Sequence, residues 1–134
     1  MNVRLNRRYH FSASHRLHNP SLSADDNRST YGKCNNPHGH GHNYTVELTL
    51  SGDVDPVTGM ICNLGELDPF IGREIVERFD RSDLNSDEWF RDSIPTTEAL
   101  ATRFFDHVSQ HFSLAKLERV RVEETENNAF EITR

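Results

Sequence analysis

The sequence predicts an α+β domain in which a four-stranded antiparallel sheet is covered on one face by two helices. Three observations lead to this prediction. Apolar residues alternate with a period of two at both ends of the chain, they recur with a helical period in the middle, and strands and helices are segregated in the order ββ, αα, ββ. The length of 134 residues indicates a single domain, residues 1–134.

The first predicted strand covers residues 5–17, where the odd positions are mostly apolar and the even positions are polar. Successive side chains of a strand point to opposite faces, so this strand is half-buried and its apolar face ends near His15. Residues 19–36 have no period and are rich in Pro, Ser, Asp and Asn. We expect a long loop there, and loops of this length in compact domains are often functional.

The second predicted strand covers residues 42–50 and alternates in the same way. Residues 55–59 have the composition of a turn, and the short apolar run 60–62 indicates the returning arm of a hairpin. At the end of the chain, residues 117–125 and 129–133 are predicted to pair across a turn. The four strands of the expected sheet are residues 5–17, 42–50, 117–125 and 129–133.

Two helices are predicted between the two pairs of strands. The first begins either at Asn63, as an N-cap, or at Asp68 with Pro69 in the first helical position. The second begins with Thr96 or Thr97 as its N-cap. Each helix has one apolar face, which is typical of a helix that packs on a sheet.

Composition excludes several classes of function. The formal net charge is −6 and the pI is near 5.7, so we expect no nucleic-acid binding. No apolar run approaches the ~20 residues that a membrane span requires, and the first residues lack the apolar core of a signal peptide, so we expect a cytoplasmic protein with no membrane contact. The two cysteines, Cys34 and Cys62, are expected to be reduced thiols.

Histidines gather in the first third of the chain. His40 and His42 lie two apart in a predicted strand, so their side chains share a face, and His15 ends the apolar face of the preceding strand. Three imidazoles with an open fourth position are typical of catalytic zinc sites. The alternative is a polar His-Gly-His turn without metal. His38 precedes the strand, and we expect it beside the ligands or the substrate, with ligation the less favoured role.

Cys34 is the candidate reactive thiol. It lies in the long loop beside Lys33 and near the predicted cation, and both would lower its pKa. A small buried side chain or a zinc ligand are the alternatives for Cys34, and burial is the better interpretation for Cys62. Glu124 shares a strand face with core residues, where a carboxylate needs partners. It could bind two N–H groups of a guanidine-like heterocycle, although a structural ion pair explains the pattern nearly as well.

These residues lie within longer motifs. The motifs are FSASHRL at 11–17, GKCNNPHGHGHNY at 32–44, DPVTGM at 55–60, TTE at 96–98 and ETENN at 124–128. With these motifs the sequence resembles the 6-pyruvoyltetrahydropterin synthase family over nearly its whole length. The family includes the related 6-carboxytetrahydropterin synthases. The five-residue gap between Cys34 and His40 resembles the pyruvoyl enzymes, because the carboxy enzymes usually have a shorter gap.

The resemblance implies a tunnelling fold, in which the sheets of three subunits close into a barrel and two trimers stack into a homohexamer with active sites between subunits. It also implies a zinc-dependent lyase that converts 7,8-dihydroneopterin triphosphate to 6-pyruvoyltetrahydropterin and releases triphosphate. Zn²⁺ would polarise side-chain oxygens while a thiolate moves protons, and no redox cofactor is needed. The implied site residues are the zinc ligands His15, His40 and His42, the catalytic residues Cys34 and Asp80, and the pterin-binding residues Glu124, Thr97 and Glu98.

One position departs from the family pattern. The family typically has Leu-Asp-His where this chain has Phe79-Asp80-Arg81, and arginine stays protonated and cannot shuttle a proton. Arg81 could stabilise a thiolate as a fixed charge, or His38 could replace the missing relay. The alternatives are a changed product, such as the 6-carboxy compound or a cleaved side chain, and a non-catalytic pterin-binding homologue.

Three cations, Arg16, Arg28 and Lys33, are plausible phosphate contacts. Scattered surface cations have the same appearance in a sequence. The sequence therefore assigns no residue to the triphosphate.

Overall fold

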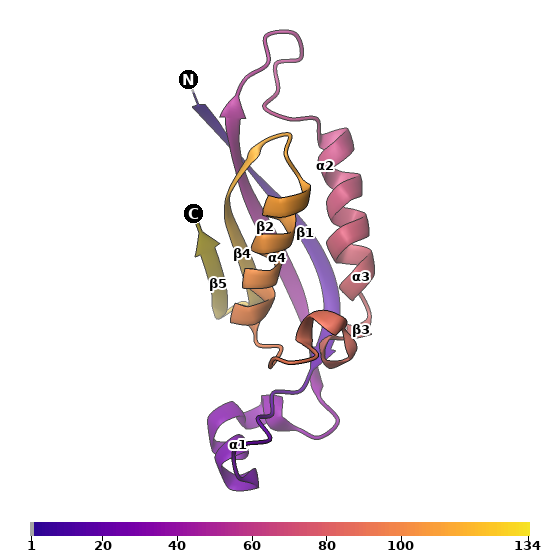
Figure 1. Cartoon of the computed structure of the whole chain (residues 1–134), viewed down its shortest axis with the longest axis vertical. Helices are drawn as coiled ribbons and strands as arrows, with labels where there is room; N and C mark the ends of the chain where they lie inside the picture. The colour runs from indigo at the N-terminus through magenta and orange to yellow at the C-terminus, as the bar shows by residue number, and fades with distance from the viewer. Residues whose placement is uncertain (1) are drawn as a thin grey trace.

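The computed structural model describes residues 2–134, and its centre is one five-stranded sheet in the order β3-β1-β2-β4-β5 (Figure 1). The strands are β1 (Asn2–His15), β2 (His40–Asp53), β3 (Ser82–Asp83), β4 (Lys116–Thr125) and β5 (Asn128–Thr133). The four long strands pair antiparallel with their neighbours, as predicted. The α+β class is confirmed.

The predicted strand number and the purely antiparallel arrangement are wrong, because β3 adds a short edge parallel to β1. Two hydrogen bonds to the backbone of Ser12 hold the segment before β3 against β1. The N–H of Arg81 donates to the carbonyl of Ser12 (2.5 Å), and the Ser12 N–H donates to the carboxylate of Asp80 (2.9 Å). A two-residue strand has no alternating pattern, so the sequence gives no sign of it.

The first predicted helix is a continuous helical run made of α2 (Leu64–Ile71), a π-type turn (Gly72–Val76) and α3 (Glu77–Phe79). It begins after Asn63, whose side chain accepts a hydrogen bond from the N–H of Gly65 (2.8 Å). Pro69 lies inside α2 and lacks an N–H to bond the preceding turn, and the π-type turn follows it. Of the two predicted starts, Asn63 is therefore the N-cap.

The second predicted helix is α4 (Thr97–His111), and Thr96 is its N-cap. The predicted hairpin after β2 is wrong, because residues 60–62 form no strand. The turn closes with a bond from the N–H of Asp55 to the carbonyl of Met60 (2.9 Å), and the cap of α2 follows after two more residues, which leaves no length for a strand. No helix of residues 2–134 is both long and apolar enough to cross a membrane.

The predicted loop over residues 19–36 contains α1 (Ala24–Tyr31) and a 3₁₀ turn (Gly32–Asn35). Ser23 caps α1, and the buried side chain of Asn27 donates to three backbone carbonyls, those of Asn19, Leu22 and Ser23. Local hydrogen bonds replace an apolar face here, so hydrophobic periodicity does not reveal the helix. Figure 1 shows that this segment projects beyond the end of the sheet.

The apolar core lies between one face of the sheet and the helices α2, α3 and α4. Phe11 of β1 stacks on Tyr44 of β2 (ring centroids 5.0 Å apart) and meets Phe104 of α4 edge-on (6.0 Å). The opposite face of the sheet is polar, and Glu47 in its centre pairs with Arg8 and Arg119. The candidate site lies where the core face reaches the end of β1 and the start of β2.

Candidate active site

Strand register brings the three predicted histidines together. His15 lies opposite His40, and Ala13 lies opposite His42, in the antiparallel pair β1–β2. The ring centroids are 5.9 Å apart for His15 and His40, 5.0 Å for His15 and His42, and 4.5 Å for His40 and His42. The three imidazoles therefore occupy one face at the end of two neighbouring strands.

Cys34 joins this cluster from the 3₁₀ turn that precedes β2. One ligand atom from each of Cys34, His15, His40 and His42 lies within 4.8 Å of all the others, and Cys34 Sγ is 3.2 Å from His40 Nε2. The N–H of Leu17 donates to the backbone carbonyl of Cys34 (2.7 Å), and this bond ties the backbone that carries the thiol to the residues after β1. We call these four side chains the His/Cys cluster.

Gly39 permits the close approach of the segment that carries His40 to the end of β1. Its φ is +71°, and a Cβ atom at this position would lie 3.0 Å from the carbonyl oxygen of His15. A side chain here would be strained by the positive φ and would push against backbone. The Gly39 position therefore sets the distance between His15 and His40.

The geometry of His15 leaves one nitrogen free for a ligand. His15 is 1% exposed, and its Nδ1–H donates to the carbonyl of Pro95 (2.9 Å), with the Tyr44 hydroxyl oxygen 3.5 Å away. That bond leaves Nε2 as the nitrogen with a free lone pair. The Nε2 atoms of His15 and of His42 are both buried and have no hydrogen-bond partner. Two unpartnered buried nitrogens in one cluster call for a bound group.

The donor set fits a zinc ion. Burial lowers the pKa of His15 and of His42, so both imidazoles are neutral and can donate a lone pair at neutral pH. Neutral imidazoles and a thiol are the ligand types that zinc prefers over magnesium or calcium. The cluster offers either three nitrogens with an open position or a closed set that includes Cys34.

The expected low pKa of Cys34 is absent in the chain without a cation. Burial, followed by the nearby charge of Glu124, raises the pKa of this thiol instead. Lys33, which was expected to lower that pKa, has an exposed side chain. A cation bound to the histidines would reverse the balance, because a positive charge beside sulfur stabilises the thiolate.

Glu124 lies at the edge of the His/Cys cluster. The register between β4 and β5 shifts between Glu123 and Thr125, and such a bulge redirects a side chain at that point. The Glu124 side chain is 15% exposed, its Oε1 is 3.8 Å from His42 Nε2, and the Thr97 hydroxyl donates to its Oε2. The buried Thr97 hydroxyl holds Oε2 of Glu124, and Oε1 is left beside the cluster.

Three other residues of interest lie outside these contacts. Glu98 is exposed on α4, Asp80 is exposed at the end of α3, and His38 is exposed in the loop before β2. Within the part of the chain that the structure describes, no hydrogen bond or ion pair links any of them to the His/Cys cluster. Arg81 is also exposed, with a φ of +59°. A single chain thus brings Glu124 to the His/Cys cluster, whereas the carboxylate of Asp80 accepts a hydrogen bond from Ser12 instead.

Sequence reasoning assigned no role to two residues that orient His15. Tyr44 shares the strand parity of His42, so that parity could have indicated its position. Pro95 contributes a backbone carbonyl from a loop 80 residues away, and nothing in the sequence signals that contact. Carbonyl bonds of this kind fix which nitrogen of a metal-binding imidazole faces the metal.

Comparisons with known proteins give a consistent result. The family model for 6-pyruvoyl tetrahydropterin synthase matches residues 4–134. The human 6-pyruvoyl tetrahydrobiopterin synthase is 42% identical over 127 residues, 94% of this chain and 88% of that protein. The Bacillus subtilis 6-carboxy-5,6,7,8-tetrahydropterin synthase is 33% identical over 111 residues, 80% and 66% of the two chains. The solved Caenorhabditis elegans 6-pyruvoyl tetrahydropterin synthase has a TM-score of 0.92 and 36% identity, and the match covers 100% of this chain and 96% of that one.

Proposed function

The chain belongs to the 6-pyruvoyl tetrahydropterin synthase family, and on that basis we propose that it is a zinc-dependent lyase that converts 7,8-dihydroneopterin triphosphate to 6-pyruvoyltetrahydropterin with loss of triphosphate. One observation carries the proposal. The His/Cys cluster, with two unpartnered buried imidazole nitrogens, lies directly beside the carboxylate of Glu124. A metal-binding group and an anchor for a heterocycle thus share one site.

His15, His40 and His42 are the proposed zinc ligands. Zinc held by these three imidazoles would supply Lewis-acid chemistry at the side-chain oxygens of the substrate, which would acidify the adjacent C–H bonds. The chain prepares the site by keeping two of the imidazoles neutral and by fixing the ring of His15 through the Pro95 carbonyl. Because His15 is fully buried, its position does not depend on solvent.

Cys34 is the proposed proton-transferring group. Its Sγ lies 3.2 Å from His40 Nε2, so a substrate held at the cluster is within reach of the thiol. Asp80 is its proposed catalytic partner, and it is exposed within one chain. Arg81 follows Asp80 and cannot pass a proton, so it can act only as a fixed positive charge.

We propose the assembly that the family resemblance implies, in which trimers close into a barrel and two trimers stack into a hexamer. Asp80 is exposed and makes no hydrogen bond to Cys34 within the described residues of one chain, which supports this arrangement because a second subunit could bring its own Asp80 to the site. The exposed outer edge of β5 supports it as well, since pairing between subunits would cover that edge.

Glu124 is the proposed anchor of the pterin ring, with Thr97 holding its second oxygen and Glu98 as a further contact. We expect Glu124→Gln to weaken binding of 7,8-dihydroneopterin by roughly 10- to 100-fold, because each lost charge-assisted bond is worth about 1.5–3 kcal/mol. Calorimetry with this phosphate-free compound measures the change. The matched control is Glu123→Gln, whose carboxylate lies 3.9 Å from Arg121. Glu123→Gln should bind 7,8-dihydroneopterin as the wild type does. If Glu124→Gln binds it equally well, the anchoring role is contradicted.

The experiment that tests the proposed reaction identifies its products. The zinc-loaded protein is incubated with 7,8-dihydroneopterin triphosphate, and the products are separated by chromatography. We expect inorganic triphosphate and 6-pyruvoyltetrahydropterin. Acetaldehyde with 6-carboxytetrahydropterin would instead establish the rival reaction, whose representative in Bacillus subtilis is the more distant of the two relatives compared.

The replacement of the relay histidine by Arg81 supports a second candidate, a pterin-binding protein without catalysis. This candidate predicts binding of 7,8-dihydroneopterin through Glu124 but no release of triphosphate above the rate without protein. The same incubation therefore separates it from the enzyme. Triphosphate release that depends on protein concentration excludes it.

A further inference from the structure

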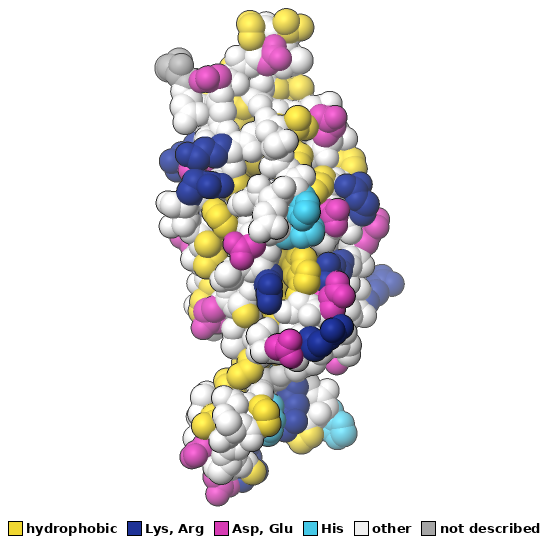
Figure 2. Space-filling view, viewed as in Figure 1, with side chains coloured by type: hydrophobic (Ala, Val, Ile, Leu, Met, Phe, Trp, Pro, Cys, Tyr) yellow, Lys and Arg dark blue, Asp and Glu magenta, His cyan; other side chains and the backbone are white. Residues whose placement is uncertain are grey.

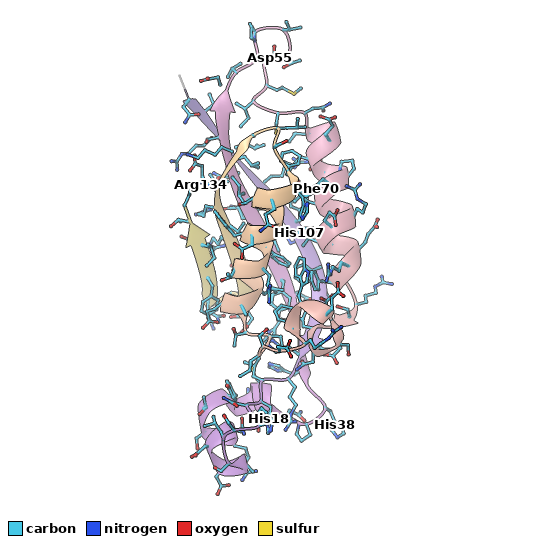
Figure 3. All side chains as sticks on the ribbon, viewed as in Figure 1. His18, His38, Asp55, Phe70, His107 and Arg134 are labelled. Atoms are coloured by element: carbon cyan, nitrogen blue, oxygen red, sulfur yellow. The ribbon has the colours of Figure 1, made fainter. Side chains whose placement is uncertain are left out.

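A cavity of about 520 Å³ opens beside the His/Cys cluster, between the α1 segment and the start of β2. Its walls contain three cations, two amide side chains and two imidazoles. The lining residues that the argument uses are Arg16, His18, Arg28, Lys33, Asn35 and His40. Figure 2 shows Lys, Arg and His side chains side by side at this end of the molecule, and Figure 3 places His18 there.

The charge of this cavity is opposite to that of the whole chain. Arg16, Arg28 and Lys33 line it, and no carboxylate does, although the formal net charge of the chain is −6. Arg28 also pairs with Asp25, but that pair is on the surface, with side chains 64% and 89% exposed, and such pairs are weak. Three cations without a lining acid make a site for a multiply charged anion.

Local hydrogen bonds orient Arg16 and the amide of Asn35 at the cavity. The Nε–H of Arg16 donates to the carbonyl of Asn35 (3.3 Å), which turns the guanidinium toward the 3₁₀ turn. The amide of Asn35 donates to the carbonyl of Leu17 (2.8 Å) and lies 3.1 Å from His18 Nδ1. The floor of the cavity is thus built from the residues that follow β1 and from the 3₁₀ turn.

The cavity continues the site already described. It shares His40 with the His/Cys cluster, and its lining residues Lys33 and Asn35 flank Cys34 in the chain. Glu124 contacts His42 and does not line the cavity. A molecule with its heterocycle at Glu124 and its reacting carbons at the cluster would therefore extend its far end past His40 into the cationic cavity.

We infer that this cavity binds the triphosphate group of the substrate and holds it as it leaves. The identity of the ligand rests on the proposed function, whereas the cationic lining does not. In the elimination, the Cys34 thiolate takes a proton from the adjacent side-chain carbon, and the electron pair of that C–H bond forms a carbon–carbon double bond. The bond between the other side-chain carbon and the phosphate ester oxygen breaks, and its electron pair leaves with the triphosphate. The cations stabilise that charge both before and after the bond breaks.

The inference has two consequences for the enzyme. Inorganic tripolyphosphate, the leaving group alone, is a competitive inhibitor with respect to the substrate. The cavity also selects substrates that carry the triphosphate, since a phosphate-free pterin leaves the three cations without a partner.

Calorimetry with inorganic tripolyphosphate on the zinc-loaded protein tests the inference, with the zinc content checked after each titration. Lys33→Met and Arg28→Met each remove a cation but keep the aliphatic stem, and each should weaken tripolyphosphate binding by about tenfold or more. Arg103→Met, on the exposed surface of α4, is the control for loss of one positive charge and should bind as the wild type does. Affinity for phosphate-free 7,8-dihydroneopterin should be unchanged in all three variants.

Unchanged tripolyphosphate binding in Lys33→Met and Arg28→Met would overturn the inference. That result would mean that tripolyphosphate binds the metal and not the cavity. The proposed function fails separately. If the wild type does not turn over the substrate but the two variants still lose tripolyphosphate binding relative to Arg103→Met, the anion site stands and the assigned substrate is wrong. If turnover occurs and the variants keep the wild-type KM, the function stands and the inference is wrong.

Discussion

Cys34→Ala is expected to lower kcat by roughly 10²- to 10⁴-fold, the usual contribution of a general acid–base group. The thiol is the proposed proton carrier beside the His/Cys cluster, and its Sγ lies 3.2 Å from His40 Nε2. Lys33, its neighbour in sequence, has an exposed side chain, and the guanidinium of Arg81 cannot shuttle a proton, so we expect neither residue to replace the thiol. Single-turnover measurement of triphosphate release gives the rate of the chemical step.

The structure offers a matched control for this variant. Cys62 is the other free thiol, it is partly buried against the core, and it is not part of the His/Cys cluster. Cys62→Ala should therefore keep the wild-type rate. Zinc retained in Cys34→Ala with the rate lost identifies the thiol as a proton carrier. An unchanged rate in Cys34→Ala would contradict its catalytic role, and loss of zinc along with activity would make it a ligand.

Strand parity predicted which histidines meet in the His/Cys cluster. His15 lies at the end of the apolar face of β1, and His40 and His42 share a face of β2. These relations depend only on the period of two in a strand and on the pairing of β1 with β2. The sequence therefore indicates which imidazoles can meet, and the structure brings them together.

The surroundings of the cluster depend on contacts that have no sequence period. The Pro95 carbonyl reaches His15 from a loop, and the bulge near Glu124 depends on the register with β5. The α1 segment is stabilised by side-chain bonds to the backbone, such as those of Asn27, instead of by an apolar face. Interactions of these kinds are specific to single residues, so they appear only when the chain is folded.

The cationic cavity illustrates the same limit. In the sequence Arg16, Arg28 and Lys33 are separated cations with no pattern. Folding of residues 19–36 into α1 and a 3₁₀ turn brings all three to the lining of one cavity next to His40. The likeness to the family supports the proposed substrate, and the fold of this segment indicates where the charged end of that substrate would lie.

His42→Ala is expected to remove the zinc ion. The Nε2 atom of His42 is buried with no hydrogen-bond partner, and its loss leaves two imidazoles in the proposed ligand set. Loss of an outer partner of a metal ligand already costs roughly 10- to 100-fold in affinity, and loss of a ligand itself should cost more. Without the metal, triphosphate release should fall to the rate without protein.

His38→Ala is the matched control, because His38 belongs to the same sequence cluster but is exposed and lies outside the His/Cys cluster. The deciding measurement is the zinc content per chain, determined by atomic absorption after dialysis of the wild type, His42→Ala and His38→Ala. We expect about one zinc per chain in the wild type and in His38→Ala, because the described residues contain one His/Cys cluster. We expect almost no zinc in His42→Ala. Undiminished zinc in His42→Ala, or a wild type that releases triphosphate at full rate without zinc, would contradict it.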